Sequence, residues 1–332
     1  MIPLLIGIPA VLAVLFQLIR NEKARGYVVY AGAGIIMLTT VIFIVRWITG
    51  GAHIWMLYPE TELIDHLMTA GDIFLMCLII YLSVKHGKVL PIILSVVQTA
   101  VVLYTEFTVE VKEGPHMMVD WLTILMCIII AFIGGFICIY TVGYMKGYHA
   151  HHKDVKDRQP FFFSMLFLFL AAMFGLVLSQ NLIWIYFFWE ITSVISFLMI
   201  GYTRSDEAVN NSFCALWMNL LGGLGFAVAI ALMAQMQGTL QLMDVVGIGA
   251  LLPLMCLSLA GLTKSAQLPF STWLLGAMVA PTPSSALLHS ATMVKAGVYL
   301  LIRISPALEG NLVGIIVSSI GGLTFIMASM MA

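Results

Sequence analysis

The feature that most constrains this chain is a series of long apolar runs separated by short polar loops. A helix of about 20 apolar residues spans the ~30 Å hydrocarbon core of a bilayer, and most of the runs approach this length. They lack the alternating segments of about ten residues that mark a membrane β-barrel. Lipid offers the backbone no hydrogen bonds, so each peptide group must be paired within its own helix. We therefore predict an all-α integral membrane protein, a polytopic bundle of about eleven transmembrane helices, over residues 2–19, 27–48, 66–84, 89–104, 118–145, 161–179, 182–202, 209–236, 248–262, 284–302 and 312–331.

Composition supports this class and excludes others. Charged residues make up 9% of the chain, whereas an ordinary soluble domain carries about 25%. The formal net charge is −1 and no basic stripe is present, so nucleic acid is not expected as a partner. The five cysteines lie singly in apolar runs and form no CxxC pair, which indicates small buried hydrophobes. No glycine-rich loop follows a strand, and we expect no cofactor and no metal in this chain.

Positive charge alternates from loop to loop. Short cytoplasmic loops are enriched in lysine and arginine, so the basic loops are assigned to the cytoplasmic side. This places the N-terminus outside. The basic loops hold Arg20, Lys23, Arg25, Lys85, Lys88, Lys146, Lys153, Lys156, Arg158 and Arg204; the loops between them hold Glu60, Glu62, Glu110, Glu113 and Asp244, with Lys112 as their lysine.

The candidate ionisable residues within the membrane are Asp72, Glu190, Lys264, His289 and Lys295. A charge at the bilayer centre costs at least ~2.5 to 3.5 kcal/mol, so such residues suggest an ion path. The alternative for each is a structural link between helices. For Asp72 that alternative is a bond to a hydroxyl or exposure to the headgroups.

Lys264 lies beside a predicted helix break. Pro269 cannot donate a backbone hydrogen bond, so the carbonyl of Ser265 loses its helical partner and the helix should end near the lysine. Irregular backbone at this depth is tolerated only around a buried or wet cavity. We expect freed carbonyls, with Thr263, Ser265 and Gln267, to hold a water or the ammonium group.

A carboxylate and a lysine in this setting can form an electrostatic switch. Each stabilises the charged form of the other, so moving Glu190 away from Lys264 would favour release of the lysine proton. His289 is suited to relay a proton, and Lys295 offers a second proton-holding group. Their six-residue spacing puts His289 and Lys295 about 120° apart on a helix.

The remaining polar residues have simpler interpretations. Arg46 and Arg303 lie at the ends of apolar runs, and we expect their side chains to extend to the interface. His149, His151 and His152 lie on a charged loop without cysteine, so we favour solvated loop residues over a metal site.

Three stretches resemble one family, the antiporter-like membrane subunits shared by respiratory complex I, Mrp-type sodium/proton antiporters and energy-converting hydrogenases. Residues 264–301, with KSAQLPFSTW, APTP and HSATMVKAG, resemble the broken-helix signature. Residues 183–202 resemble the glutamate helix, and residues 117–126 resemble the helix that opens the core. The resemblance implies two inverted five-helix repeats, each forming a half-channel, with Glu190, Lys264 and His289 in the family's ion-translocating positions.

Details of the resemblance favour the hydrogenase branch. Lys295 resembles the version in the hydrogenase and Mrp large-subunit branches, and the stretch 273–283 resembles the hydrogenase branch. This implies a proton-translocating subunit in the cytoplasmic membrane of a prokaryote. Its implied partners are other membrane subunits and a peripheral redox arm that holds the [NiFe] centre and the iron–sulfur clusters. An Mrp-type antiporter subunit, a complex I subunit and a purely structural anchor remain alternatives, and sodium is not excluded as the ion.

The chain also departs from the family pattern. Two apolar segments, 66–84 and 89–104, are additional to the simpler members, and the second repeat is almost absent, as though the chain were truncated. We divide the chain into N-terminal helices (1–117), a half-channel core (118–303) and the first helix of a second repeat (304–332).

Overall fold

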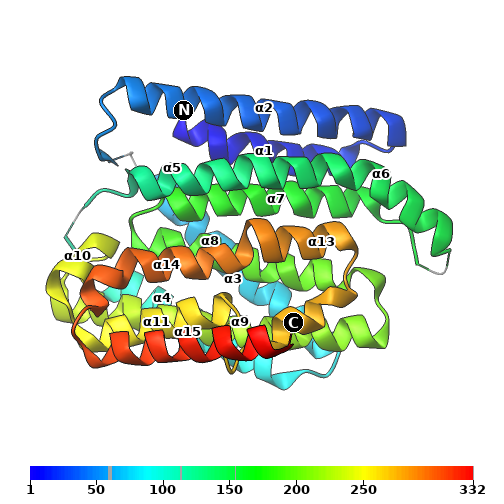
Figure 1. Ribbon diagram of the computed structural model, residues 1–332. Helices are drawn as coiled ribbons and strands as arrows, with labels where there is room; N and C mark the ends of the chain where they lie inside the picture. The colour runs from blue at the N-terminus through cyan, green and yellow to red at the C-terminus, as the bar shows by residue number, and fades with distance from the viewer. Residues whose placement is uncertain (59–61, 113, 154, 332) are drawn as a thin grey trace.

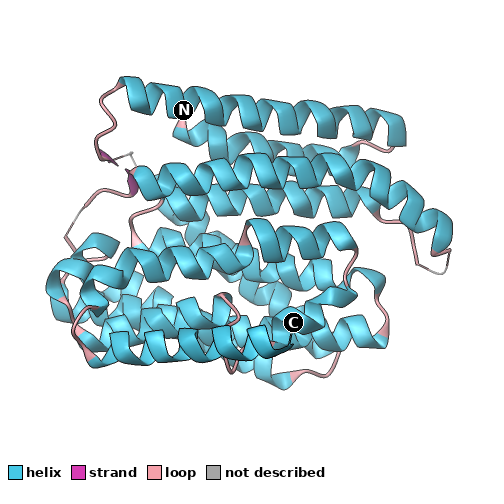
Figure 2. Ribbon diagram, viewed as in Figure 1, coloured by secondary structure: helices cyan, strands magenta, loops and turns pink. Residues whose placement is uncertain are grey.

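The computed structural model describes residues 1–58, 62–112, 114–153 and 155–331; Glu60 and Glu113 lie outside the described residues. It is almost wholly helical, with long helices side by side in alternating directions (Figures 1 and 2). Among the described residues, nine helical segments are long and apolar enough to cross a membrane, and two shorter apolar helices, α1 and α11, account for the other predicted runs. The predicted all-α polytopic bundle is confirmed. The helices are α1 (Ile2–Leu18), α2 (Glu22–Thr49), α3 (Glu62–Lys85), α4 (Val89–Thr108), α5 (Trp121–Ile128), α6 (Gly135–His151), α7 (Gln159–Leu178), α8 (Leu182–Ile200), α9 (Asp206–Gln237), α10 (Leu242–Ile248), α11 (Leu251–Lys264), α12 (Thr272–Gly276), α13 (Thr282–Ala286), α14 (Met293–Leu308) and α15 (Leu312–Met331).

The centre of the bundle is α7, which is buried on nearly every side. A helix that is apolar all round belongs inside a bundle, because it has no polar face to turn outward. On one side α7 packs against α1, where Phe16 and Phe167 lie 4.9 Å apart and Ser164 donates to the carbonyl of Ala13. On another side it packs against α8, which leads to α9.

Helices α3 and α4, which we predicted to be additional to the simpler family members, pack against α8 and α9. α3 lies against α8, and α4 lies along α9. In Figure 1 they form the cyan layer behind α9 and α11. Polar side chains of α3 and α4 can therefore reach buried side chains of α8.

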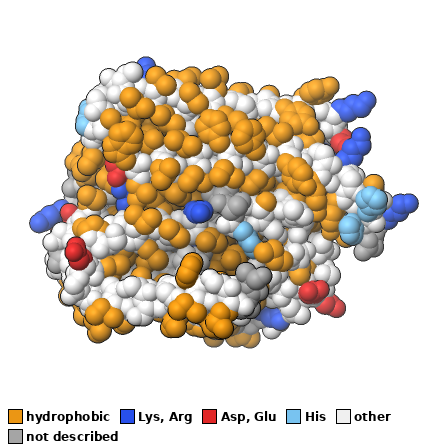
Figure 3. All heavy atoms as spheres, in the orientation of Figure 1, with side chains coloured by type: hydrophobic (Ala, Val, Ile, Leu, Met, Phe, Trp, Pro, Cys, Tyr) orange, Lys and Arg blue, Asp and Glu red, His pale blue; other side chains and the backbone are white. Residues whose placement is uncertain are grey.

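The outer surface fits a lipid environment. In Figure 3 hydrophobic side chains cover much of the visible face, and most of the charged ones gather toward the left and right, where helices begin and end. Membrane helices place their ionisable residues at the interfaces because charge is costly in hydrocarbon.

Two local features were not predicted. Strands β1 (Trp55–Leu57) and β2 (Met117–Val119) pair antiparallel and join two loops on the acidic side of the bundle. The run over 118–145 is also not one regular helix, because a π-helical turn (Ile129–Gly134) joins α5 to α6. There Gly134 lets the Leu170 side chain approach to within 2.5 Å of where a Cβ would stand, which no larger residue would allow.

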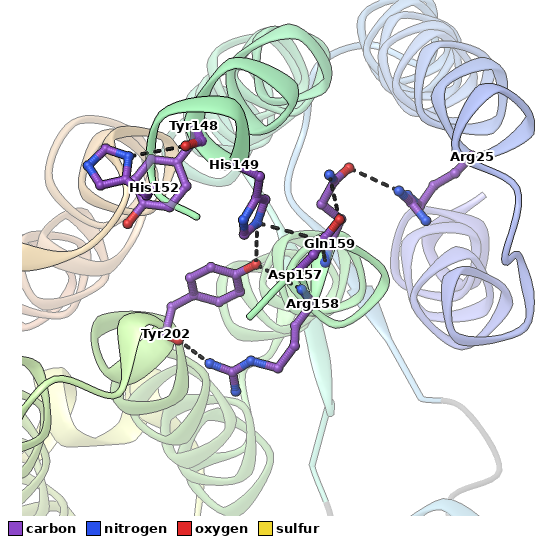
Figure 4. Close-up of polar contacts among 8 residues, drawn as sticks. All are labelled: Arg25, Tyr148, His149, His152, Asp157, Arg158, Gln159 and Tyr202. Carbon is purple, nitrogen blue, oxygen red and sulfur yellow. Dashed lines mark hydrogen bonds and ion pairs between the residues drawn. The ribbon is translucent and has the colours of Figure 1, made fainter. Parts of the chain in front are cut away.

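On the opposite, basic side, a polar network ties four helix ends together (Figure 4). Gln159 accepts from the buried Arg25 guanidinium at 2.9 Å and donates to Asp157 at 3.2 Å. His149 lies 3.1 Å from the Tyr202 hydroxyl and 3.5 Å from Asp157. His149 therefore links α6 to the end of α8, and within the described ranges no group of three or more His, Cys, Asp or Glu side chains is placed to hold a metal.

Candidate functional site

Lys264 is the last residue of α11 and is fully buried. Its ammonium group donates to the Trp189 carbonyl at 3.0 Å and to the Ser193 hydroxyl at 2.8 Å, both on α8. It also lies 4.8 Å from the centroid of the Trp189 ring, close enough for a cation–π contact. A buried charge needs such partners, since an unpaired one would be neutralised or displaced. These contacts fix the lysine against the middle of α8.

The predicted helix break beside Lys264 is confirmed. The helix ends there, Ala266 follows with φ 53°, and the next helix begins at Thr272. The expected ligands of the ammonium group were wrong, however. Ser265 donates to the carbonyl of Gly261 at 2.6 Å, because its short side chain lies close to a carbonyl of its own helix. The long side chain of Lys264 instead reaches α8. The carbonyl of Thr263 accepts from the Trp273 indole at 2.9 Å.

Glu190 follows Trp189 on α8 and is 3% exposed. One carboxylate oxygen, Oε2, accepts from the Gln98 amide of α4 at 2.9 Å, while Oε1 is buried with no hydrogen-bond partner among the described residues. Glu190 and Lys264 interact electrostatically, but they form no ion pair within 4.0 Å in the described part of the chain. The carboxylate and the ammonium group are therefore neighbours held apart, each by its own partners.

Gly223 of α9 makes room for this carboxylate. A Cβ at this position would stand 2.5 Å from Glu190 Oε1 and 2.7 Å from Gln98 Oε1. Real Cβ atoms essentially never approach so closely, so a side chain here would displace one of the two groups. Gly223 thus allows the carboxylate and the amide to lie directly on the backbone of α9.

His289 and Lys295 are placed differently from each other. His289 lies in a second π-helical turn (Leu287–Ala291), partly buried, with Nε2 unpartnered among the described residues. Lys295 is exposed, although Gly297, two residues on, lies so close to α11 that a Cβ there would be 2.5 Å from the Gly261 carbonyl. The structure therefore brings Glu190 and Lys264 together through α8 and leaves Lys295 on the outer surface.

Asp72 is the second buried carboxylate of this region. It is 6% exposed, receives no hydrogen bond from a described residue, and interacts electrostatically with Glu190 and Glu106. Neither of the simple alternatives for Asp72, a hydroxyl partner or the headgroup region, describes this position. Two buried carboxylates that lie close together repel each other unless a proton or cation lies between them.

A cavity of about 970 Å³ opens on the acidic side of the bundle, where Glu62 and Asp65 of α3 line its wall. Glu106 in its wall accepts from the Thr69 hydroxyl at 2.6 Å, and Asp65 accepts from the Trp184 indole at 2.6 Å. Asp65, Thr69 and Asp72 are spaced four and three residues apart, so they lie along one face of α3. This face leads from the acidic cavity toward Glu190.

Sequence reasoning missed the polar partners of the charged residues. Gln98 and Ser193 are uncharged, so a prediction based on ionisable residues in apolar runs does not include them. A polar residue in the middle of a membrane helix is itself a signal, because it must find a partner there.

Arg303, which we expected to extend to the interface, has a specific partner there at the start of α5. It forms a two-pronged ion pair with Asp120, at 2.5 and 2.7 Å. Asp120 also caps α5 by accepting from the Thr123 backbone at 2.9 Å. Burial alone would raise the pKa of Asp120, but hydrogen bonds from Arg303 and Thr123 outweigh it and hold that pKa below its ordinary value. The pair clamps α14 to the start of α5.

Two parts of the chain match known protein families. Residues 179–332, which include Glu190, Lys264 and His289, match the family described as NADH:quinone oxidoreductase/Mrp antiporter, transmembrane part. Residues 114–154 match the family described as the N-terminus of chain 5 of NADH-ubiquinone oxidoreductase (complex I). The chain belongs to the antiporter-like subunits of complex I and Mrp antiporters.

Curated members of this antiporter-like family cover much of the chain. A Staphylococcus aureus (strain JH9) protein, named as an antiporter subunit, mnhA2, is 39% identical over 223 residues, which are 64% of this chain and 27% of the relative. The same protein of strain USA300 is 38% identical over 223 residues, with the same shares covered. The chain thus spans about a quarter of the length of the curated relatives it matches.

Two solved structures resemble the chain. The Mrp complex from Dietzia sp. DQ12-45-1b has a chain that is 28% identical, with a TM-score of 0.54 over 76% of this chain and 29% of that one. The membrane-bound sulfane sulfur reductase, an archaeal respiratory membrane complex, is 17% identical, with a TM-score of 0.69 over 99% of this chain and 57% of that one. The second likeness concerns the fold alone.

Proposed function

We propose that this chain carries a proton-conducting half-channel of an Mrp-type cation/proton antiporter, with protons moving through Glu190, Lys264 and His289. The choice of the Mrp branch rests on identity, since the antiporter subunits of Staphylococcus aureus share 39% of the matched residues. The subunit would lie in the cytoplasmic membrane of a bacterium, with its N-terminus outside, together with other membrane subunits.

The observation that carries the proposal is the buried ammonium group of Lys264 at the end of a broken helix. This group binds the carbonyl of Trp189, the residue next to Glu190 on α8. A membrane protein retains such a costly charge where an ion must pass. The lysine is held by neutral groups, the Trp189 carbonyl and the Ser193 hydroxyl. Its positive charge is therefore not cancelled by direct contact with a carboxylate.

The separation of Glu190 from Lys264 suggests how the switch works. Gln98 holds the carboxylate on the side of α4, away from the ammonium group. Release from Gln98 would let the carboxylate approach the lysine and stabilise its charge, and return to Gln98 would favour loss of the lysine proton. The free Oε1 atom of Glu190 is available to accept a proton at either position.

The additional helices α3 and α4 would supply the approach from outside. Protons or hydrated cations would gather in the acidic cavity and pass Glu106 and Asp72 on their way to Glu190. His289, whose Nε2 has no hydrogen-bond partner among the described residues, would then relay the proton onward. Lys295 is exposed on α14, and we assign it to the step that follows His289.

The test is ion transport by vesicles that contain the assembled complex. Lys264→Ala and Glu190→Gln are expected to abolish cation-driven pH gradients, because each removes a proton-holding group from the path. The exposed Lys23→Ala and Glu207→Gln are matched controls that should transport normally. Gradients that survived both site variants would show that the chain is a structural anchor. Varying sodium against pH in the same vesicles identifies the coupled ion.

A second candidate is a proton-translocating subunit of an energy-converting hydrogenase, with the [NiFe] centre and iron–sulfur clusters in partner subunits. The motif over residues 273–283 favours it. The proteins that co-purify with the chain decide between the candidates. Small antiporter subunits support the first, and a nickel-iron subunit supports the second.

A further inference from the structure

A second cavity, of about 920 Å³, lies between α3 and the group formed by α7, α8 and α9. Its wall is apolar over most of its length, with Phe74, Leu78 and Leu82 from α3 facing Val194 and Leu198 from α8. It runs from Gly71 to Lys85, which is about 21 Å along α3 at 1.5 Å per residue. The groove therefore extends from one membrane interface past the ~15 Å depth of one leaflet's hydrocarbon.

The groove ends in four basic side chains, Lys85, His86, Arg158 and Arg204. They belong to the loops that the alternation of charge assigns to the cytoplasmic side. Within the described parts of the chain, none of the four forms an ion pair with a carboxylate. The end of the groove thus holds concentrated positive charge that no described carboxylate pairs with.

Arg158 shows that this charge is partly desolvated. One of its terminal nitrogens donates to the Tyr202 carbonyl, as Figure 4 shows, and its Nε is buried with no partner among the described residues. Burial first, and then the like charge of Arg204, lower the pKa of the Arg158 guanidinium. A bound anion would satisfy the free donor and offset the repulsion between the two arginines.

We propose that this groove binds an anionic phospholipid of the cytoplasmic leaflet, with acyl chains between α3 and α8 and the phosphate on Arg158 and Arg204. Basic pockets between transmembrane helices on the cytoplasmic side recognise anionic headgroups. An apolar groove that ends in uncompensated basic groups matches the two chemical parts of such a lipid. A soluble phosphate would leave the apolar length unused, and a zwitterionic lipid would leave the basic charge unbalanced.

The lipid would fill a gap beside the ion path. Gly71, at the deep end of the groove, precedes Asp72, and Phe187 in the same wall lies three residues before Glu190. A bound lipid would hold α3 against α8, so that Asp72 stays close to Glu190. The site is separate from the ion path, and it stands even if the proposed transport function is wrong.

The test is native mass spectrometry of the purified assembly, with dioleoyl phosphatidylglycerol or dioleoyl phosphatidylcholine added at equal concentration. Retention of phosphatidylglycerol should exceed that of phosphatidylcholine about tenfold or more. Replacing two basic residues, in Lys85→Gln with Arg204→Gln, should weaken phosphatidylglycerol binding roughly 25-fold, at about 1 kcal/mol for each charge near the headgroup. The exposed Arg20→Gln, on the same side of the membrane, is the control and should bind normally.

A second variant tests the apolar part. Leu78→Trp should fill the groove and remove both lipids, whereas Tyr81→Trp, on the exposed side of the same helix, should not. Equal retention of the two lipids, or normal binding by the charge variant, would overturn the proposal. Competition by glycerol phosphate as strong as by the lipid would indicate a soluble anion instead. A cross-link from position 78 to a partner subunit would indicate a protein occupant.

Discussion

Single residues decide how a charge survives at the centre of the bundle. Lys264 is tolerated because two oxygen atoms of α8 and the face of Trp189 replace its hydration. Ser193 serves twice, since its hydroxyl accepts from Lys264 at 2.8 Å and donates to the Trp189 carbonyl at 3.0 Å. Gln98 does the corresponding work for Glu190. Neutral polar residues thus set the positions of both charges.

At this scale we predict that Ser193→Ala destabilises the protein by about 1.5 to 3 kcal/mol, the usual value of a hydrogen bond to a charged group. The fully buried ammonium group would lose one of its two oxygen partners. Thermal unfolding in detergent measures the loss. Ser196→Ala, one turn further along α8, removes a hydroxyl that does not contact Lys264 and should cost less. Equal losses for the two variants would count against this role of Ser193.

At the scale of elements, irregular helices carry the functional groups. Lys264 ends a helix, and His289 lies in a π-helical turn. Such interruptions expose backbone groups and turn side chains inward, and π-helical turns are frequent at functional sites. The additional hairpin of α3 and α4 is equally important, because it supplies Gln98 and Asp72 to the surroundings of Glu190.

We predict that Asp72→Asn lowers the rate of pH-gradient formation by roughly tenfold, which corresponds to about 1.4 kcal/mol in the barrier. The amide keeps the shape of the carboxyl group but cannot carry a proton or attract a cation toward Glu190. Because no described residue donates to Asp72, the melting temperature should change little. The measurement is the initial rate in vesicles, with the exposed Glu110→Gln as the matched control. A normal rate for Asp72→Asn would remove α3 from the path.

At the scale of the whole molecule, the pair of Asp120 and Arg303 joins segments that are 183 residues apart. It clamps α14, which follows the broken helix, to the beginning of α5. Arg303 also donates to the Thr123 hydroxyl at 2.7 Å, so the clamp is a small network rather than a single contact. The interior between α5 and α14 is thereby closed on this side of the bundle.

We predict that Asp120→Asn lowers the stability at neutral pH by about 1.5 to 3 kcal/mol, because Arg303 would lose its charged partner. The pKa of Asp120 is lower in the folded protein than its ordinary value. The stabilisation is therefore complete above the unfolded-state value of about 3.9 and is lost as the pH falls through the lower folded value. Thermal unfolding of both proteins between pH 7 and pH 3 measures this. The difference between them should shrink at the acid end, and a constant difference would contradict the assignment.

The amino-acid sequence alone predicts the class of the protein, the approximate positions of its helices and the break beside Lys264. Long apolar runs can only be membrane helices, and Pro269 cannot continue α11, so the bundle and the break at Lys264 followed from local chemistry. The partners of the charges were decided by the tertiary structure. Arg303 pairs with Asp120, Glu190 bonds to Gln98 of an additional helix, and Lys295 faces outward, because these contacts depend on how helices far apart in sequence pack together. Periodicity within one helix fixes which residues share a face, but it cannot say which neighbour that face meets.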